Sequence, residues 1–182
     1  MDDRWFDYLQ SCSENHPGNE KHAVEMKLNA AMRRLSEALV EHTVADAIIE
    51  IGSNLMACEQ MAILVIEPEK KKDPVLQSVG LTEQVLESLR SNATGIVTAV
   101  REGELYVKEH TDKPHPLLFS LGATAAVPLW QNKKPKGAIV FFGFLPQRNG
   151  LDAGDLAVLK LLTVYAGPCL FNTNETEEES AG

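Results

Sequence analysis

Apolar side chains recur along this chain at two spacings, and each spacing predicts a different kind of element. From residue 21 to about 41 they return every third or fourth position, which places them on one stripe of a long amphipathic helix. A second helix is expected to follow Thr43, which is a favourable N-cap residue. Continuous apolar runs at residues 61–66 and 138–145 predict buried strands, because both are short and rich in β-branched or aromatic residues.

Between these two runs the pattern predicts further strands at residues 75–79, 105–108 and 123–130. Two short helices are expected at residues 82–92 and 94–102, and a polar turn at 131–137 closes a hairpin. A final helix should begin after Asp152 as its cap, and a Gly167-Pro168 pair should kink it near its end. This helix is apolar almost all round, so it must be covered on two sides.

One internal segment, residues 110–122, fits neither spacing. It contains two prolines, two histidines and four large apolar side chains. A loop of this length inside a compact domain is usually functional or mobile. The segment is therefore the first place to look for a site.

The two ends differ in composition from the rest. Residues 1–20 form a separate segment in which four large apolar side chains, Trp5, Phe6, Tyr8 and Leu9, precede a polar, turn-forming link. This segment is expected either to dock on the domain of residues 21–173 or to contact a partner. Residues 174–182 are acidic, small and polar, which predicts a disordered tail.

Composition narrows the class of protein. With 182 residues, 44% of them hydrophobic and 24% charged, the chain suits one globular domain. A net charge of −9 argues against nucleic-acid binding, and the lysines at 70–72 are expected to be a solvated loop. No run reaches the roughly 20 apolar residues of a membrane helix, and the first residues are acidic, unlike a signal peptide. Three distant cysteines favour a cytoplasmic location.

The order of predicted elements, together with three local sequences, resembles a GAF domain. Residues 94–107 resemble the family's Gly-x-x-x-x-Val-x-x-x-Gly-Glu-Pro-x-x-Val segment, with Leu105 in place of Pro. Residues 125–129 resemble its Ser-x-x-x-Val-Pro-Leu strand, residues 136–140 its Gly-x-Leu-x-Val strand, and residues 151–171 its closing helix. The resemblance covers roughly residues 25–172, and these motifs are specific for fold rather than for function.

The resemblance implies an α+β, PAS-related fold with a central antiparallel sheet of about six strands. The first, second and last helices would cover one face, and a small-molecule pocket would lie on the other, under the middle helices and the long loop. The polar and aromatic residues available to such a pocket are His110, Thr111, His115, Phe119, Ser120 and Thr124.

GAF domains commonly pair through a bundle of their first and last helices, so the resemblance also implies a homodimer and a protein partner. The apolar residues expected at that interface are Leu28, Ala31, Leu35, Leu39, Leu159 and Leu162.

The sequence does not identify a cofactor. Phe144 lacks the acidic pair that follows it in cyclic-nucleotide GAF domains, and a bilin would need a cysteine near the middle loop. Haem is disfavoured, because His110 and His115 lie in a proline-rich loop where a histidine is usually exposed. No carboxylate or cysteine pattern supports a closed metal site.

Two functions from different classes remain open after an enzyme is set aside. The free methionine-(R)-sulfoxide reductases are single GAF domains that need two cysteines around the pocket, and this chain has none between Gln60 and Pro168. The favoured hypothesis is a non-catalytic sensor of a small molecule that signals through dimer or partner contacts. The alternative is a scaffold whose pocket has collapsed around Leu117, Leu118 and Phe119.

Overall fold

The computed structural model describes residues 18–66, 72–103, 105–110, 114–148 and 150–179, with the backbone alone at 18–20, 101–103 and 172–179. Its helices are α2 (Gly18–Glu41), α3 (Val44–Glu50), α4 (Glu83–Gly103), α5 (Pro116–Ser120) and α6 (Ala153–Glu179), with a π-helical turn η1 (Ile51–Leu55) and a 3-10 turn η2 (Lys108–His110). Its strands are β1 (Cys58–Val65), β2 (Val75–Val79), β3 (Tyr106–Val107), β4 (Ala125–Gln131) and β5 (Lys134–Phe144).

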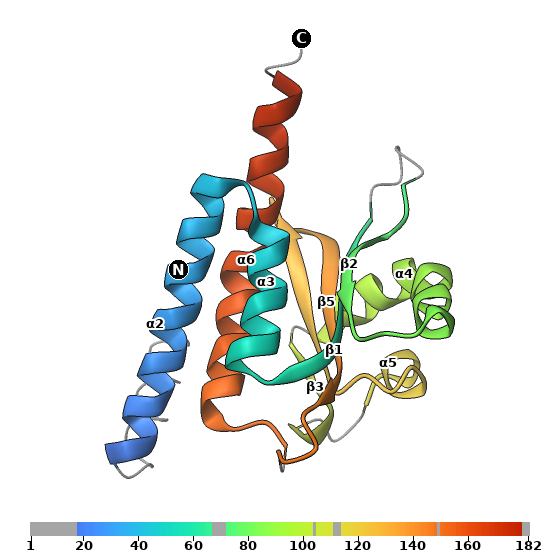
Figure 1. The fold of residues 1–182 in the computed structure, drawn as a ribbon. Coiled ribbons are helices and arrows are strands. Elements are labelled where there is room, and N and C mark those ends of the chain that lie inside the picture. Colours follow the sequence, from blue (N-terminus) through green and yellow to red (C-terminus); the bar gives the residue numbers. More distant parts are fainter. Residues whose placement is uncertain (1–17, 67–71, 104, 111–113, 149, 180–182) are drawn as a thin grey trace.

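The molecule has three layers, with the sheet in the middle (Figure 1). The strands are ordered β2-β1-β5-β4-β3, and neighbouring strands run antiparallel. Helices α3 and α6 lie on one face, and α2 packs against both of them. Helices α4 and α5 lie on the opposite face.

Successive side chains of the central strands point alternately into two hydrophobic cores, one on each face of the sheet. On β5, Ile139 and Phe141 belong to the core beneath α2, α3 and α6, whereas Ala138 and Val140 belong to the core beneath α4 and α5. Successive side chains of a strand point to opposite faces. Both faces are covered, so the run is apolar throughout, as its sequence predicts.

The expected α+β architecture is confirmed, but the sheet has five strands rather than six. The sequence pattern itself predicts five, and the sixth came only from the family resemblance. The β4–β5 turn is also shorter than predicted: Asn132 and Lys133, with φ of 51° and 62°, form a two-residue turn. Positive φ at both central residues matches the right-handed twist of a hairpin, so β5 begins already at Lys134.

The prediction of two helices at residues 82–102 is wrong, because α4 is continuous. Asn92 was expected to end the first helix, but its side-chain amide donates to the Ser88 carbonyl oxygen at 2.8 Å within the helix. Gly95 also lies inside α4, and a Cβ atom there would be 3.0 Å from Leu117 Cδ2 of α5. The glycine thus allows α5 to approach α4 closely.

Helix α6 begins at the predicted place and continues through Pro168 to Glu179. It therefore passes Asn174, where the sequence placed the start of a disordered tail; residues 180–182 lie outside the described part. Gly167 serves close packing, because a Cβ atom there would be 2.3 Å from the Trp130 carbonyl oxygen on β4.

A tight connection joins α2 to α3. His42 adopts a φ of 57°, and the Thr43 amide donates to the Ala38 carbonyl oxygen at 3.0 Å, which is the hydrogen bond of a Schellman motif. Thr43 occupies the expected N-cap position of α3, but its side chain makes no capping bond. Its φ and ψ, −117° and 33°, differ from the extended conformation in which a threonine hydroxyl usually reaches the helix amides.

Candidate functional site

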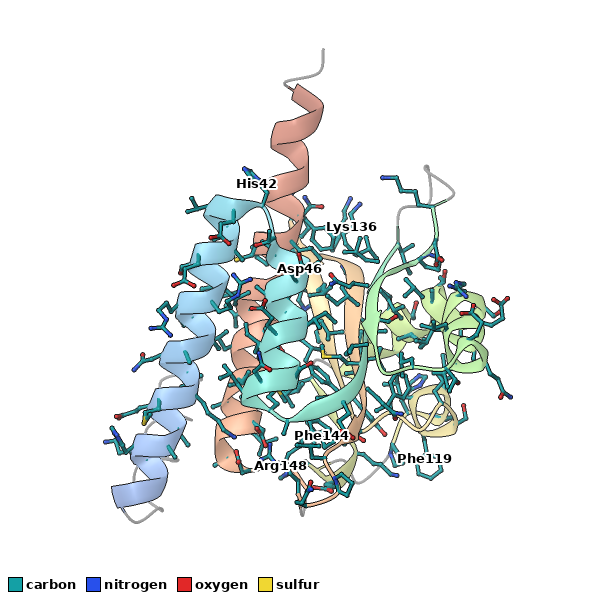
Figure 2. The ribbon with its side chains drawn as sticks, viewed as in Figure 1. His42, Asp46, Phe119, Lys136, Phe144 and Arg148 are labelled. Atoms are coloured by element: carbon teal, nitrogen blue, oxygen red, sulfur yellow. The ribbon has the colours of Figure 1, made fainter. Side chains whose placement is uncertain are left out.

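Five of the six predicted pocket residues lie in the described part of the chain. His110 is exposed, Thr111 lies outside the described residues, and the His115 Nδ1 atom accepts from the Leu117 amide at 3.3 Å as the N-cap of α5. Phe119 is 55% exposed and points away from the sheet (Figure 2), with Lys108 Nζ 5.4 Å from its ring centroid.

The two remaining candidates are held by local hydrogen bonds. Ser120 Oγ donates to the Leu117 carbonyl oxygen at 2.9 Å, one turn back in its own helix. Thr124 Oγ1 donates to the Phe142 carbonyl oxygen of the neighbouring strand at 2.6 Å. A hydroxyl whose proton is engaged in this way can offer a ligand only its acceptor lone pairs.

Apolar side chains fill much of the layer between α4, α5 and the sheet. Leu89, Ile96, Leu118 and Val140 are completely buried there, and Leu117 packs against the same cluster. The scaffold alternative predicts that Leu117, Leu118 and Phe119 fill the space of a pocket. Leu117 and Leu118 do pack into this layer, whereas Phe119 does not.

One buried polar atom in this layer has no hydrogen-bond partner among the described residues. Tyr106, on β3, is 6% exposed, and its hydroxyl oxygen is buried without a hydrogen bond to any described residue. A buried polar group left unpaired costs about 1–3 kcal/mol. Burial also raises the pKa of Tyr106, so this hydroxyl stays neutral and is available as a donor. Tyr106 lies in the strand predicted at residues 105–108, and a tyrosine on a short buried strand is the sequence signal for such a group.

The residues expected at a dimer interface are mostly used inside the chain. Ala31, Leu35, Leu159 and Leu162 are at most 3% exposed, because they belong to the core between the sheet and helices α2, α3 and α6, and Leu28 packs against the same core. Leu39 is 37% exposed. Among the described residues, the other exposed large apolar side chains of these two helices are Met26, Met32, Val40, Val164 and Tyr165.

A cluster of four charged side chains joins the start of α6 to α2 and to the end of β5. Asp155 is fully buried and accepts from Lys27 Nζ at 2.9 Å and from Arg148 Nη2 at 2.6 Å. Lys27 and Arg148 also bond Asp152, at 2.9 and 2.7 Å. Arg148 lies beside the first turn of α6 (Figure 2), where it also donates to the Met56 carbonyl oxygen at 2.6 Å.

The two carboxylates also close the N-terminus of α6. The Asp155 amide donates to Asp152 Oδ1 at 2.8 Å, and the Asp152 amide donates to Asp155 Oδ2 at 3.0 Å, which is a reciprocal capping box. Burial opposes ionisation of Asp152, but hydrogen bonds from Lys27 and from the Asp155 amide, with the charge of Arg148, lower its pKa below the usual value. The sequence predicted Asp152 as the cap; the Asp-x-x-Asp spacing was the signal for Asp155.

Burial raises the thiol pKa of both described cysteines. Cys58 is buried, its Sγ atom donates to the carbonyl oxygens of Gln60 and Gly143, and burial raises its pKa to about 11. Burial likewise raises the pKa of Cys169. A thiol held protonated at neutral pH is a poor nucleophile. Cys12 lies outside the described residues.

Neither a metal nor a membrane site stands out in the described part of the chain. No group of three or more His, Cys, Asp or Glu side chains there could hold a metal ion. By length and composition alone, Ala153–Phe171 of α6 could cross a membrane, but 61% of this window is buried in the fold. A core helix passes the same test, so the support for a membrane span is weak.

Comparison with known proteins is informative about the fold. A family model described as GAF domain matches residues 38–170. The structure is similar to the GAF domain of an Acinetobacter phosphoenolpyruvate-protein phosphotransferase, with a TM-score of 0.53, 13% identity, and coverage of 84% of this chain and 98% of that one. It is also similar to a GAF domain/HD domain protein from Geobacter sulfurreducens, with a TM-score of 0.51, 14% identity, and coverage of 72% and 93%.

A third similar structure is a domain of a putative two-component sensor histidine kinase from Sinorhizobium meliloti 1021, with a TM-score of 0.51, 11% identity, and coverage of 78% and 97%. No curated protein matches the chain. At these identities the solved structures establish the fold and leave ligand and partner open.

Proposed function

Since this chain belongs to the GAF family, whose domains are commonly sensory or regulatory modules of signalling proteins, we propose that it is a non-catalytic, cytoplasmic regulatory module that acts by pairing with a second copy of itself. The contact would be made by the helical layer of α2 and α6. The observation that carries this proposal is an apolar strip on that layer, defined here as Met32, Leu39, Val164 and Tyr165, which we call the α2–α6 strip.

Helix geometry supports placing these four residues together. Lys27 of α2 binds Asp155 of α6 and Asp152, which immediately precedes α6. These bonds hold the two helices in register, and both helices run in the same direction (Figure 1). At 1.5 Å per residue, Leu39 lies about 18 Å above Lys27, and Tyr165 lies about 15 Å above Asp155. They are therefore at nearly the same height.

The sides of α2 are also distinguishable. Arg34, seven residues after Lys27, bonds Glu50 and so marks the flank of α2 that faces α3. Each residue of a helix is rotated by about 100° from the one before it. By this rotation, Met32 and Leu39 lie on one side of the buried stripe that contains Leu28 and Leu35, and Arg34 lies on the other side. Met32 and Leu39 border the open side of the α2–α6 seam, where an exposed apolar surface is available to a partner. A twofold axis would pair one strip with the same strip of a second copy.

Sedimentation analysis over a range of concentrations tests the proposal. We expect Tyr165→Glu to weaken dimerisation about 100-fold or more, because it places an unpaired charge in an apolar contact. The matched control is Met26→Glu, which adds the same charge to the face of α2 that points away from α6. Measurements on the full chain and on a chain lacking residues 1–10 should both be made; a monomer in both at about 100 µM would refute the proposal.

Small-molecule sensing is a second candidate, and the unpaired Tyr106 hydroxyl favours it. A ligand lying between β3 and α4 would complete the hydrogen bond that this atom lacks, as the few polar groups of an otherwise apolar pocket usually do. Native mass spectrometry of the purified protein, repeated after denaturation, would weigh such a ligand. Loss of the bound mass in Tyr106→Phe would support sensing. Sensing would be refuted if the purified protein carried no bound mass and Tyr106→Phe were more stable than the natural chain. The buried hydroxyl would then only lower the free energy of unfolding.

A further inference from the structure

We infer that the N-terminal aromatic segment, residues 5–9, folds back onto the α2–α6 strip and competes there with a second copy of the chain. Docking of this segment does not depend on the dimer proposed above, although the competition does. Four observations carry the inference: where the chain enters α2, how far it can reach, which side chains it brings, and which surface is open.

The described part of the chain begins at Gly18, the first residue of α2, at the same end of the molecule as the start of α6 (Figure 1). Residues preceding Gly18 therefore start beside the lower end of the α2–α6 seam. Met32, the lowest member of the strip on α2, is 14 residues along the helix from Gly18, which is about 21 Å.

The link is long enough for this distance. Nine chain steps separate Leu9 from Gly18, and an extended chain covers at most about 3.3–3.6 Å per residue, or roughly 30 Å in total. A flexible link of this length has an average span of roughly 15–18 Å, which is close to the distance required. Leu9 can thus contact Met32 without strain, and Trp5 would then lie further up the strip, toward Leu39 and Tyr165.

The side chains of the segment suit this surface. If residues 5–9 form a helical turn, Trp5, Tyr8 and Leu9 share one face, because they are three and four positions apart. Trp5 and Tyr8 can bring aromatic rings to Met32, and a methionine sulfur makes favourable contacts with ring edges. Asp2, Asp3 and Asp7 would stay in water, so the segment covers apolar surface without burying a charge.

A tethered segment has an advantage over a second copy. A short flexible link gives an effective concentration in the millimolar range, so even a weak contact keeps the strip largely covered. Both strips must be open before two copies can pair. If each strip is covered nine-tenths of the time, dimerisation is weakened about 10-fold for each protomer, or about 100-fold in all. The segment would therefore set the concentration at which the module pairs.

Trp5 is a built-in reporter of docking. The chain has two tryptophans, so Trp130→Phe leaves Trp5 as the sole emitter. In this variant, at a concentration where the protein is monomeric, we expect Trp5 emission to be blue-shifted and protected from acrylamide relative to the same protein in denaturant. Met32→Glu or Tyr165→Glu should remove the shift and the protection. Met26→Glu, on the outer face of α2, should leave both unchanged, and circular dichroism should show every variant folded.

Three outcomes would overturn the inference: Trp5 emission equal to that of the denatured chain, protection that survives both strip substitutions, or loss of protection in Met26→Glu alone. Should Trp130→Phe fail to fold, 5-fluorotryptophan in the natural chain gives two ¹⁹F signals, assigned by Trp5→Phe, and the same three substitutions apply. Deleting residues 1–10 separates the two proposals. A dimer about 100-fold tighter supports both, whereas unchanged association with docking established leaves the docking intact and refutes pairing through the α2–α6 strip.

Discussion

Asp155 is the residue on whose charge the contact between α2 and α6 depends most. It is fully buried, and it accepts hydrogen bonds from the Lys27 ammonium, the Arg148 guanidinium and the Asp152 amide. Asp155→Asn keeps the shape of the side chain, removes the negative charge, and turns two N–H donors toward groups that are themselves donors. Each hydrogen bond to a charged group contributes about 1.5–3 kcal/mol, and removing one partner of a buried ion pair costs about 3–5 kcal/mol.

The cost is reduced because the two cations keep other partners. Lys27 and Arg148 both remain bonded to Asp152, and Arg148 keeps the Met56 carbonyl oxygen. We therefore expect Asp155→Asn to lower the free energy of unfolding by about 3 kcal/mol. In a urea titration with a slope near 2 kcal/mol per molar, the midpoint should fall by about 1.5 M at unchanged slope.

Asp152→Asn is the matched control for this measurement. It removes the same charge from the same cluster, but the Asp152 side chain is 52% exposed, and water can replace part of what is lost. Its expected cost is about 1 kcal/mol. The reasoning is refuted if Asp155→Asn costs no more than Asp152→Asn, because burial of the carboxylate would then make no difference.

Three further changes test other parts of the fold. His42→Gly should raise the melting temperature by a few degrees, since a positive φ strains any residue with a Cβ atom; an unchanged or lower value would contradict this. Gly167→Ala should lower the free energy of unfolding by about 1–3 kcal/mol, because α6 must move away from Trp130. Gly95→Ala is the control and should be close to neutral, because its new Cβ atom would meet only a flexible leucine side chain. Equal losses in the two variants would contradict close packing at Gly167. The lowered pKa of Asp152 contributes stability above about pH 4, the unfolded value, which is lost as the pH falls through the folded pKa. Melting temperatures from pH 7 to 2 should therefore fall more steeply in the natural chain than in Asp152→Asn, and parallel curves would show that the pairing is weak.

The central strands could be predicted from sequence because burial on both faces of the sheet requires a continuous run of apolar residues. In β1 and β5 every position between residues 61 and 64 and between 138 and 141 is buried, so the run of apolar letters is itself the signal. Helix boundaries were less predictable. Asn92 has a side chain that can end a helix or bond within one, and only the packing of α4 against the sheet selects the second.

The candidate site could not be predicted in the same way, because its contacts join distant parts of the chain. Lys27 meets Asp152 across 125 residues, and although the local sequence marks Asp152 as a helix cap, it gives no sign of this pairing. Tyr106 gave a weak local signal, but the absence of a partner for its hydroxyl is a property of the packed layer. The proposed pocket residues were chosen because they are polar or aromatic and lie in or beside a loop, and three of them, His115, Ser120 and Thr124, form hydrogen bonds with the backbone.

The charged cluster and the α2–α6 strip are parts of one arrangement. Met32 and Leu39 border α6 only while α2 keeps its register, and Lys27, bonded to Asp152 and Asp155, contributes to fixing this register. A change at Asp155 should therefore act at a distance: Asp155→Asn should expose Trp5 to acrylamide even under conditions where the sheet remains folded. Tyr165→Glu should expose Trp5 without lowering the urea midpoint by a comparable amount, because Tyr165 is 42% exposed in the folded chain. If both variants lose stability and Trp5 protection in equal proportion, the strip is simply part of the core; if they separate, it is a surface whose shape the buried carboxylate maintains.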